Sequence, residues 1–589
     1  MGQKVRQFSC MHISFTLPAH LQAEVSAVTT AWQGKSNVVR FWARDASLWT
    51  GEDESKWMGW LDIVERQQKD SAQFRALAED VRSAGFEHVL LLGMGGSSLC
   101  PEVFSLTFGR QKGFPHLQIV DSTDPAQIRA VEQSVDLKKT LVIVSSKSGS
   151  TLEPNILQQY FFAQMQKAVG ADKAGSHFIA VTDPGSKMEQ VARDHGFRKI
   201  FYGDASIGGR YSALSNFGMV PAAAMGLDVE KLLAQAKLAV DASKKPNIAE
   251  NPGVQLGLVL GAAANTGRDK ITFFASPQVH DLGAWLEQLI AESTGKQGKG
   301  ITPVDREAIT TPEHYGSDRV FAYIRLQGSD NAATDAAVAK LAQAGHPVVQ
   351  VEMAQTYDIG QQFFSWEMAT AVAGAVMDIN PFNQPDVEAS KIETKRLTSE
   401  YEQTGKLPHR EPIFTEEVAQ DAIALYAGER YAAVLQGALP TGGKHDLTAY
   451  LRAHLAQVQA GDYFATLAYI EMNAANEAVL QRFRHAVRDA KRVATCLGFG
   501  PRFQHSTGQD YKGGPNTGVF LQVTAEHAED LAIPGQKFTF GVVLAAQAAG
   551  DLAVLDQRGR RSLRVHLGKD VAAGLARLND AMHKALLLA

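Results

Sequence analysis

The chain has 589 residues, of which 45% are hydrophobic and 21% charged, so at about 100–200 residues per domain it has room for roughly three to five domains. Its 58 basic and 63 acidic residues give a net charge of −5, which argues against a protein built to bind nucleic acid or an anionic membrane. Three cysteines, Cys10, Cys100 and Cys496, lie far apart. This excludes a cysteine-based zinc motif or disulfide framework and fits a reducing, cytoplasmic compartment. No apolar run approaches the roughly 18 residues of a membrane helix.

Short apolar runs alternate with amphipathic helical patterns over much of the chain, which predicts parallel sheets covered by helices on both faces. The first set of runs is HVLLLG, LQIV, TLVIVSS and HFIAVT, beginning at His88. A second set, ITFFAS, FAYIRL and HPVVQVEM, begins near Lys270 and leads into a long helical pattern from Ile359 to about Met377. The predicted fold class is therefore α/β, with two parallel-sheet sandwich domains.

The C-terminal part of the chain is predicted to hold a third α/β unit. It partly repeats the second set, because FAYIRL, NAA and VVQVEM match LAYIEM, NAA and VFLQVT further along, with roughly 33 extra residues in the later copy. Those residues include GFGPRFQHSTGQ. The proline-containing segment before this unit is predicted to be a connector with two helices. The predicted divisions are 1–45, a helical N-terminal extension; 46–245 and 246–395, the two sandwich domains; 396–450, the connector; and 451–589, the third unit.

Two polar loops follow strands of the first set. GMGGSS would let backbone N–H groups and a helix N-terminus approach an anion, and SSKSGST adds hydroxyls and a lysine. Since parallel strands end at one edge of a sheet, the two loops together predict a site for a phosphorylated small molecule. A dinucleotide site, as in a NAD-dependent dehydrogenase, is the weaker alternative because GMGGSS lacks the third glycine of that fingerprint. The candidate binding residues are Gly96, Ser97, Ser146, Lys147, Ser148 and Thr151.

Four further motifs carry groups that could do chemistry. In GGRYS, Arg210 could stabilise an oxyanion. In WLEQLIAESTGK, Glu292 lies at a predicted helix end and could remove a proton next to a carbonyl. The turn in INPFNQPDVEASK leads into a helix with Gln384 and Lys391 in its first turns, and His505 in FQHSTGQ could exchange protons near neutrality.

In this order, GMGGSS, SSKSGST, GGRYS, WLEQLIAESTGK and INPFNQPDVEASK resemble the successive motifs of the glucose-6-phosphate isomerase family, over roughly residues 45–391. That family has two sugar-isomerase (SIS) domains. The whole chain is similar to the long isomerase module fused to transaldolase in some bacteria, although the residues before the match are too few for a barrel of about 250 residues. The resemblance implies reversible isomerisation of glucose 6-phosphate and fructose 6-phosphate through a cis-enediol, in glycolysis and gluconeogenesis, without metal or organic cofactor.

The resemblance also implies roles for single residues. Glu292 would move the proton between C2 and C1, Arg210 would stabilise the enediolate, and the loop residues named above would hold the phosphate. Gln384 and Lys391 match the family's second signature. Three positions depart from the family: Asn383 replaces an aspartate, Asp386 replaces a glycine, and Cys100 stands where glycine is frequent.

The family histidine is expected in a His-Ser-x-Gly-Gln motif between the glutamate and the lysine. Here HSTGQ comes after Lys391 instead. We therefore assign the ring-opening role, shared with Lys391, to His505, with His314 as the alternative. We further expect that the C-terminal unit delivers His505 within the same chain.

Other functions fit parts of the pattern. A non-catalytic SIS-type sugar-phosphate sensor would share the phosphate loops, and a dual phosphoglucose and phosphomannose isomerase would share the whole site. The expected partner is a small sugar phosphate, with no nucleic acid or membrane, and the expected assembly is a monomer or a homodimer.

Overall fold

The computed structural model describes residues 11–418, 421–442 and 445–588. Two compact units divide the chain. The first is made of residues 11–120, 135–294 and 320–383, and the second of residues 121–134, 295–319 and 384–588. The second unit therefore contains two segments whose neighbours in sequence belong to the first. Cys100 and Cys496 are buried thiols outside any disulfide, and Cys10 lies outside the described residues.

The first unit contains a sheet of order β3-β2-β4-β5-β6 whose paired strands are all parallel. Every residue of the inner strand β4 is buried, which explains why it appears in the sequence as a continuous apolar run. The four strands predicted for this sheet are confirmed, and β6 is an additional edge strand. Their bounds are β2 (His88–Leu92), β3 (His116–Val120), β4 (Thr140–Ser145), β5 (Phe178–Thr182) and β6 (Lys199–Tyr202).

Four strands of the same unit, in the order β1-β10-β9-β7, belong to a second sheet. Its parallel pair β9 and β10 confirms the predicted strands, but β1 pairs antiparallel with β10 and was not predicted, because the N-terminal extension was expected to be helical. The strand β1 is half-exposed and short, so it lacks the apolar run of an inner strand. The bounds are β1 (His12–Thr16), β7 (Lys270–Ala275), β9 (Arg319–Leu326) and β10 (Val348–Met353).

Helices cover the sheets of the first unit. The most extensive packing between its helices joins α15 to α11 and α12. Every residue of α15 from Ile359 to Ala375 is buried, so the helix has no exposed face, as expected of a helix packed on all sides. The helices are α1 (Ala19–Gly34), α2 (Asn37–Trp42), α3 (Trp60–Lys69), α4 (Ala72–Ser83), α5 (Leu99–Phe108), α7 (Leu152–Val169), α8 (Ala171–Ala174), α9 (Lys187–Asp194), α10 (Asn216–Ala224), α11 (Val229–Ser243), α12 (Pro252–Asn265), α13 (Leu282–Thr294), α14 (Ala332–Gln343) and α15 (Ile359–Val376).

One carboxyl group in α15 is buried at a cost in stability. Glu367 is fully buried, and neither of its carboxyl oxygens has a hydrogen-bond partner among the described residues. Burial raises the pKa of Glu367 well above its ordinary value. The folded protein therefore holds Glu367 in its protonated form. Above the pKa of the unfolded state, the carboxyl group must take up a proton when the chain folds, or else be buried with its charge, so the free energy of unfolding falls as the pH rises.

We expect Glu367→Gln to stabilise the protein at pH 8 relative to the wild type, with the gain shrinking towards pH 4. Each unit of pKa elevation is worth about 1.4 kcal/mol. The measurement is the difference in thermal midpoint between the two proteins across that pH range, and a difference independent of pH would contradict the prediction. Glu54→Gln is the matched control, since Glu54 is also buried but accepts bonds from Thr50 and from Glu52 N; it should destabilise.

The second unit contains a sheet of order β11-β12-β16-β15-β13-β14. The central pairs are parallel, and the hairpin β11–β12 is added antiparallel at one edge. The connector predicted to hold two helices therefore also supplies two strands. The pair β13 and β15 is adjacent and parallel, as β9 and β10 are in the first unit. The bounds are β11 (Phe414–Val418), β12 (Asp421–Tyr426), β13 (Tyr463–Tyr469), β14 (Ala494–Phe499), β15 (Gly518–Ala525) and β16 (Arg561–Leu567), with a short strand β8 (Thr302–Val304) in the same unit.

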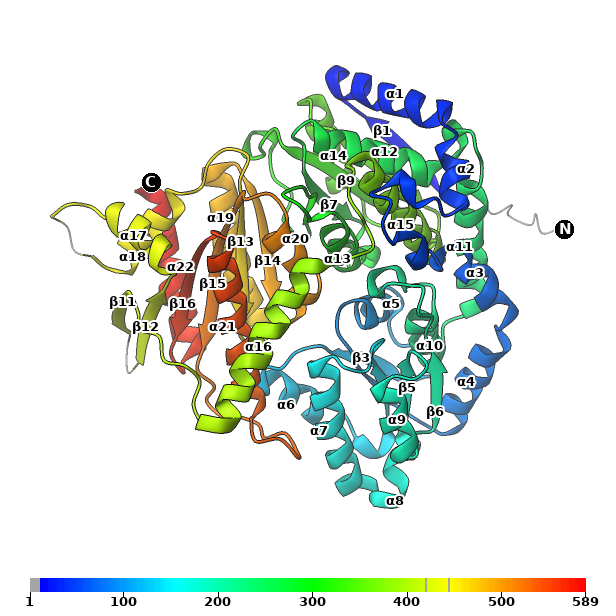
Figure 1. The fold of residues 1–589 in the computed structure, drawn as a ribbon, viewed down its shortest axis with the longest axis horizontal. Helices are drawn as coiled ribbons and strands as arrows, with labels where there is room; N and C mark the ends of the chain where they lie inside the picture. Colours follow the sequence, from blue (N-terminus) through cyan, green and yellow to red (C-terminus); the bar gives the residue numbers. More distant parts are fainter. Residues whose placement is uncertain (1–10, 419–420, 443–444, 589) are drawn as a thin grey trace. The chain divides into compact units, whose positions relative to one another are not determined.

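Both faces of this sheet carry an apolar core. Helices α18, α19 and α22 contribute to one core, and α21 with the segment around α20 contributes to the other. Figure 1 shows α16 running alongside α21, and these helices share one of the largest contacts of the unit. No helix among the described residues is long and apolar enough to cross a membrane. The helices are α6 (Pro125–Gln133), α16 (Pro385–Thr404), α17 (Glu429–Gly437), α18 (Leu447–Leu455), α19 (Ala474–Lys491), α20 (Gly508–Gly513), α21 (Phe540–Gln557) and α22 (Val571–Leu587).

Candidate functional site

The loops GMGGSS and GGRYS meet in the first unit. A Cβ on Gly96 would lie 2.0 Å from the carbonyl oxygen of Gly209, so only glycine allows the two backbones to come this close. The predicted residue Ser97 ends the short helical turn that follows β2, and it is buried. The first phosphate loop is thus packed directly against the segment that carries Arg210.

The loop SSKSGST joins β4 to the N-terminus of α7. The Ser146 hydroxyl is buried and has no hydrogen-bond partner among the described residues. Ser148 is exposed, with its hydroxyl 2.9 Å from that of Ser150, and Thr151 occupies the N-cap position of α7 without capping it through its side chain. Polar groups left unused at a helix N-terminus are what an anion site requires.

Lys147 does not extend freely into solvent. Its ammonium group forms an ion pair with Asp183 and donates to the backbone oxygen of Asp204 at 2.9 Å. Two residues later the loop requires a glycine, because Gly149 has φ +64° and a Cβ there would lie 2.6 Å from Met188 N. Asp183 and Asp204 therefore hold Lys147 in place, and nothing in the sequence pattern indicated them.

Arg210 is buried and held by three neighbours. Its Nη2 donates to the carbonyl oxygens of Pro381 at 2.7 Å and Asn383 at 2.9 Å, and its Nε donates to Ser293 Oγ at 2.8 Å. The side chain is thus fixed between the segment after Glu292 and the start of INPFNQPDVEASK. Asn383, one of the departures from the family, contributes its backbone oxygen to this arrangement.

Glu292 is in the last turn of α13, and the structure places it beside Arg210. Its Oε1 lies 3.5 Å from Arg210 Nη1, and its Oε2 accepts a hydrogen bond from Gln288 Nε2 at 3.0 Å. Both side chains are almost fully buried, with relative exposures of 11% for Glu292 and 2% for Arg210. A carboxylate and a permanently charged guanidinium therefore face one another in a shielded setting.

Gln384 and Lys391 belong to the second unit, at the N-cap and within α16. Gln384 is exposed. The Lys391 side chain is half-exposed, with its Nζ 3.6 Å from Glu388 on the same helix. Such a contact between exposed groups is weak and leaves the lysine easy to redirect.

His505 ends a short helical turn and is half-buried, in a segment that is firmly packed on both sides of it. Phe503 and Tyr511 enter the apolar core of the second unit. Gln504, the residue before the histidine, donates to the Tyr469 hydroxyl at 2.6 Å and to the backbone oxygen of Gln547 at 3.1 Å. The glycine-containing segment around His505 is therefore anchored.

The residues that directly follow HSTGQ contact the residues that follow Glu292 in sequence. A Cβ on Gly295 would lie 2.2 Å from Asp510 Cα, Gly298 N donates to Gly513 O at 2.9 Å, and Thr302 Oγ1 donates to Asp510 Oδ2 at 2.8 Å. These contacts are made within one chain and within the second unit.

His314, the alternative histidine, has a different environment. Its Nδ1 is 3.1 Å from Thr310 Oγ1 and 3.9 Å from a carboxylate oxygen of Asp489. These two neighbours lie neither directly after Glu292 nor in α16. The assignment of the ring-opening role to His505, with His314 as the alternative, stays a prediction.

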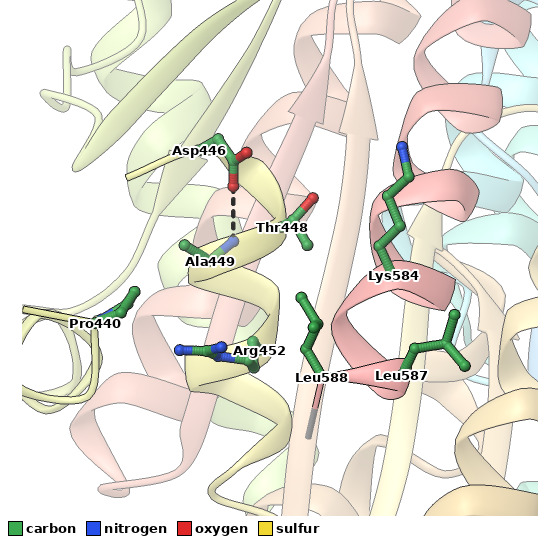
Figure 2. A pocket seen from close by; sticks show the side chains of 8 residues that line it. All are labelled: Pro440, Asp446, Thr448, Ala449, Arg452, Lys584, Leu587 and Leu588. Atoms are coloured by element: carbon green, nitrogen blue, oxygen red, sulfur yellow. Dashed lines mark hydrogen bonds between the residues drawn. The ribbon is translucent and has the colours of Figure 1, made fainter. Parts of the chain in front are cut away.

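A hollow in the second unit is unrelated to these motifs (Figure 2). It has a volume of about 470 Å³ and lies where α18 begins and α22 ends. Asp446 caps α18 by accepting a bond from Ala449 N at 2.9 Å, as the dashed line in Figure 2 shows. The lining includes Leu587 and Leu588, which are exposed, and no residue of the predicted site.

Comparisons with known proteins agree with the motif order. The family model for phosphoglucose isomerase matches residues 56–317. A glucose-6-phosphate isomerase from Rubrobacter xylanophilus is 30% identical over 367 residues, covering 54% of this chain and 83% of that protein. The chain belongs to the phosphoglucose isomerase family.

Two solved structures share the fold of this family member. A glucose-6-phosphate isomerase from Chlamydia trachomatis superposes with a TM-score of 0.54 at 19% identity, covering 65% of this chain and 87% of that one. A hypothetical protein from Thermus thermophilus superposes with a TM-score of 0.57 at 24% identity, covering 66% and 99%. The α/β class with mostly parallel sheets is thereby confirmed, and about a third of this chain extends beyond either match.

Proposed function

We propose that this isomerase interconverts glucose 6-phosphate and fructose 6-phosphate through a cis-enediol intermediate. The observation that carries the proposal is the buried pairing of Glu292 with Arg210, 3.5 Å apart, in a member of the phosphoglucose isomerase family. A carboxylate is the base that moves a proton between adjacent carbons, and a guanidinium stabilises the anion that forms between the two steps. A coupled assay with fructose 6-phosphate, with and without chelator, tests the activity and the expected absence of a metal requirement.

In the proposed reaction, Glu292 removes the C2 proton of the open-chain aldose. The electrons of the C–H bond form the C1–C2 double bond, and the carbonyl oxygen takes the negative charge that Arg210 stabilises. Once the proton of the C2 hydroxyl has moved to O1, Glu292 returns its own proton to C1 and the ketose forms. Arg210 stays charged throughout because its guanidinium does not lose a proton.

Ring opening precedes this step, and we assign it to His505 with Lys391. A histidine exchanges protons near neutrality and can move one between the ring oxygen and O1. Gln509 of HSTGQ donates to the backbone oxygen of Gly295, and Thr302 donates to Asp510, the residue after the motif. These bonds support the assignment, because they tie the motif to the segment that follows Glu292.

The phosphate of the substrate is assigned to the loops GMGGSS and SSKSGST. We expect the double variant Lys147→Ala/Ser148→Ala to raise KM for fructose 6-phosphate at least about 100-fold, with kcat within about threefold, because each charge-assisted bond is worth roughly 1.5–3 kcal/mol. Steady-state kinetics measure both constants. Lys167→Ala, at the other end of α7, is the control and should leave KM unchanged. An unchanged KM in the double variant would mean that SSKSGST only begins the helix.

The remaining expectations about partners stay proposals. The substrate is a small sugar phosphate, acted on in the cytoplasm by a monomer or a homodimer. Activity with mannose 6-phosphate would identify the dual enzyme, and binding of sugar phosphate without turnover would identify the sensor. Gln384 is assigned to the substrate with Gly96, Ser97, Ser146 and Thr151.

A further inference from the structure

A single buried glutamine connects three segments of the second unit. Gln509, the last residue of HSTGQ, is fully buried. Its Nε2 donates to the backbone oxygen of Gly295 at 2.9 Å and to Asp386 Oδ2 at 2.8 Å. Its Oε1 accepts from the backbone N–H groups of Asp386 at 2.9 Å and Val387 at 3.2 Å. Both ends of the amide are therefore in use.

The partners of Gln509 adjoin residues to which the proposed function gives roles. Gly295 is three residues after Glu292, Asp386 is five residues before Lys391 on α16, and His505 is four residues before Gln509 itself. Backbone groups and short spacers connect each pair, so a shift of the amide would be passed to each of these residues. Two of the bonds also satisfy N–H groups in the first turn of α16, which have no partner within the helix.

Asp386 completes this arrangement. Its carboxylate lies 2.5 Å from Arg558 Nη2 in addition to its bond with Gln509. A Cβ on Gly513 would lie 2.3 Å from Asp386 Oδ2 and 2.8 Å from Gln509 Nε2, so glycine leaves the space that the pair occupies. Asp386 is one of the positions at which the sequence departs from the motif that the resemblance implies, and its partner Gln509 belongs to the motif found after Lys391. The departure at position 386 and the displaced HSTGQ motif are thus joined by the hydrogen bond between Gln509 and Asp386.

The helix that carries Gln509 is itself held in place. Lys512 forms an ion pair with Asp551 of α21 at 2.7 Å, with both side chains at most 1% exposed. Arg560 donates to the backbone oxygens of Lys512 at 2.7 Å and Gly514 at 2.8 Å. The short helix α20 therefore has little freedom to shift, and Gln509 is a rigid link.

We infer that Gln509 is a positioning residue for the isomerisation, and that Asp386 is its dedicated partner. The inference rests on the proposed function, since the amide contacts none of the reacting atoms. It sets the spacing between the segment after Glu292, the start of the Lys391 helix and the His505 segment. Loss of that spacing should slow turnover more than it weakens substrate binding.

The test is a pair of substitutions. Gln509→Glu removes the donor to Gly295 and places a carboxylate against Asp386, so kcat should fall at least about 100-fold while KM for fructose 6-phosphate stays within about threefold. Adding Asp386→Asn supplies an amide that can donate to the new carboxylate, and the double variant should recover at least about tenfold in kcat. Asp386→Asn alone should stay within about fivefold of the wild type.

Matched measurements separate positioning from stability. Gln235→Leu removes another buried amide, which accepts from Gln361 Nε2 at 2.8 Å in the first unit, and should lower the thermal midpoint without changing kcat. If Gln509→Glu does not fold, Gln509→Asn should reduce kcat about tenfold at unchanged KM. Wild-type kcat in the folded Gln509 variant, or no recovery on adding Asp386→Asn, would overturn the inference. An inactive wild type would instead overturn the proposed function.

Discussion

Glu292→Gln is expected to lower kcat at least about 10³-fold, because a positioned general base contributes about 10²–10⁴-fold and no other carboxylate is assigned to the C2 proton. Binding of fructose 6-phosphate should stay within about tenfold, since the phosphate loops supply most of the affinity. A variant that loses binding and turnover together, or keeps turnover, would remove Glu292 from the role of base.

We expect the Glu292→Gln protein to fold, because the neighbours of Glu292 can accommodate a glutamine. Glutamine has the shape of glutamate, and its oxygen can still face Arg210 Nη1. The amide nitrogen would then face Gln288, whose side chain can rotate to present its oxygen instead of the Nε2 that donates now. Glu287→Gln, which removes a carboxylate from the same helix α13, is the control and should keep full activity.

Solvent exchange gives a second readout for Glu292. In deuterated water, the wild type should introduce deuterium at C2 of glucose 6-phosphate, because the proton held by the base exchanges with solvent between steps. The Glu292→Gln protein should introduce none over the same time, as followed by NMR. Continued exchange in the variant would show that another group removes the proton.

The strands with the most continuous apolar runs could be predicted from the sequence, and several partly exposed strands could not. β4 is buried over its whole length and appears as TLVIVS, an apolar run that any parallel sheet requires. β1, β11 and β12 are partly exposed, so their composition resembles that of loops. Their pairing partners are distant as well, since β12 lies against β16, and local patterns carry no information about such pairing.

The family resemblance, and not the residues alone, predicted that Glu292 and Arg210 act on the same substrate. The structure shows that their side chains face one another. The residues that hold each group were not predictable. Asp183 pairs with Lys147 from a different strand end, and Gln509 is joined to Asp386 over more than a hundred positions. The resemblance indicated a departure at Asp386 but no role for it, and the structure shows that its carboxylate is bonded to Gln509 and Arg558.

His505→Ala is expected to lower kcat with glucose 6-phosphate about 10²–10³-fold, in the range of general acid–base catalysis, while His314→Ala stays within about twofold of the wild type. Point substitution is preferable to deleting residues 450–589. The segment 295–319 depends on them, because Arg484 donates to the backbone oxygen of Asp305 at 2.8 Å and Thr495 N donates to Glu307 at 3.1 Å. A deletion would therefore disturb the segment after Glu292.

An isotope effect distinguishes ring opening from the later proton transfer. With glucose 6-phosphate deuterated at C2, a reaction limited by removal of that proton is slowed by the heavier isotope. If His505 opens the ring, His505→Ala makes opening rate-limiting, and the isotope effect on kcat should fall towards one. An isotope effect that persists at the wild-type size, together with a loss of activity in His314→Ala, would transfer the role to His314.

Mixing two inactive proteins tests whether His505 acts within its own chain. Gln509 of HSTGQ and the next residue, Asp510, contact Gly295 of the same chain, so each chain should use its own histidine. A mixture of His505→Ala and Glu292→Gln proteins, unfolded and refolded together to allow exchange of chains, should then show no more activity than the two variants refolded separately. A clear gain in activity on mixing would mean that a second chain supplies the histidine, and the connection made by Gln509 would not be the one used in catalysis.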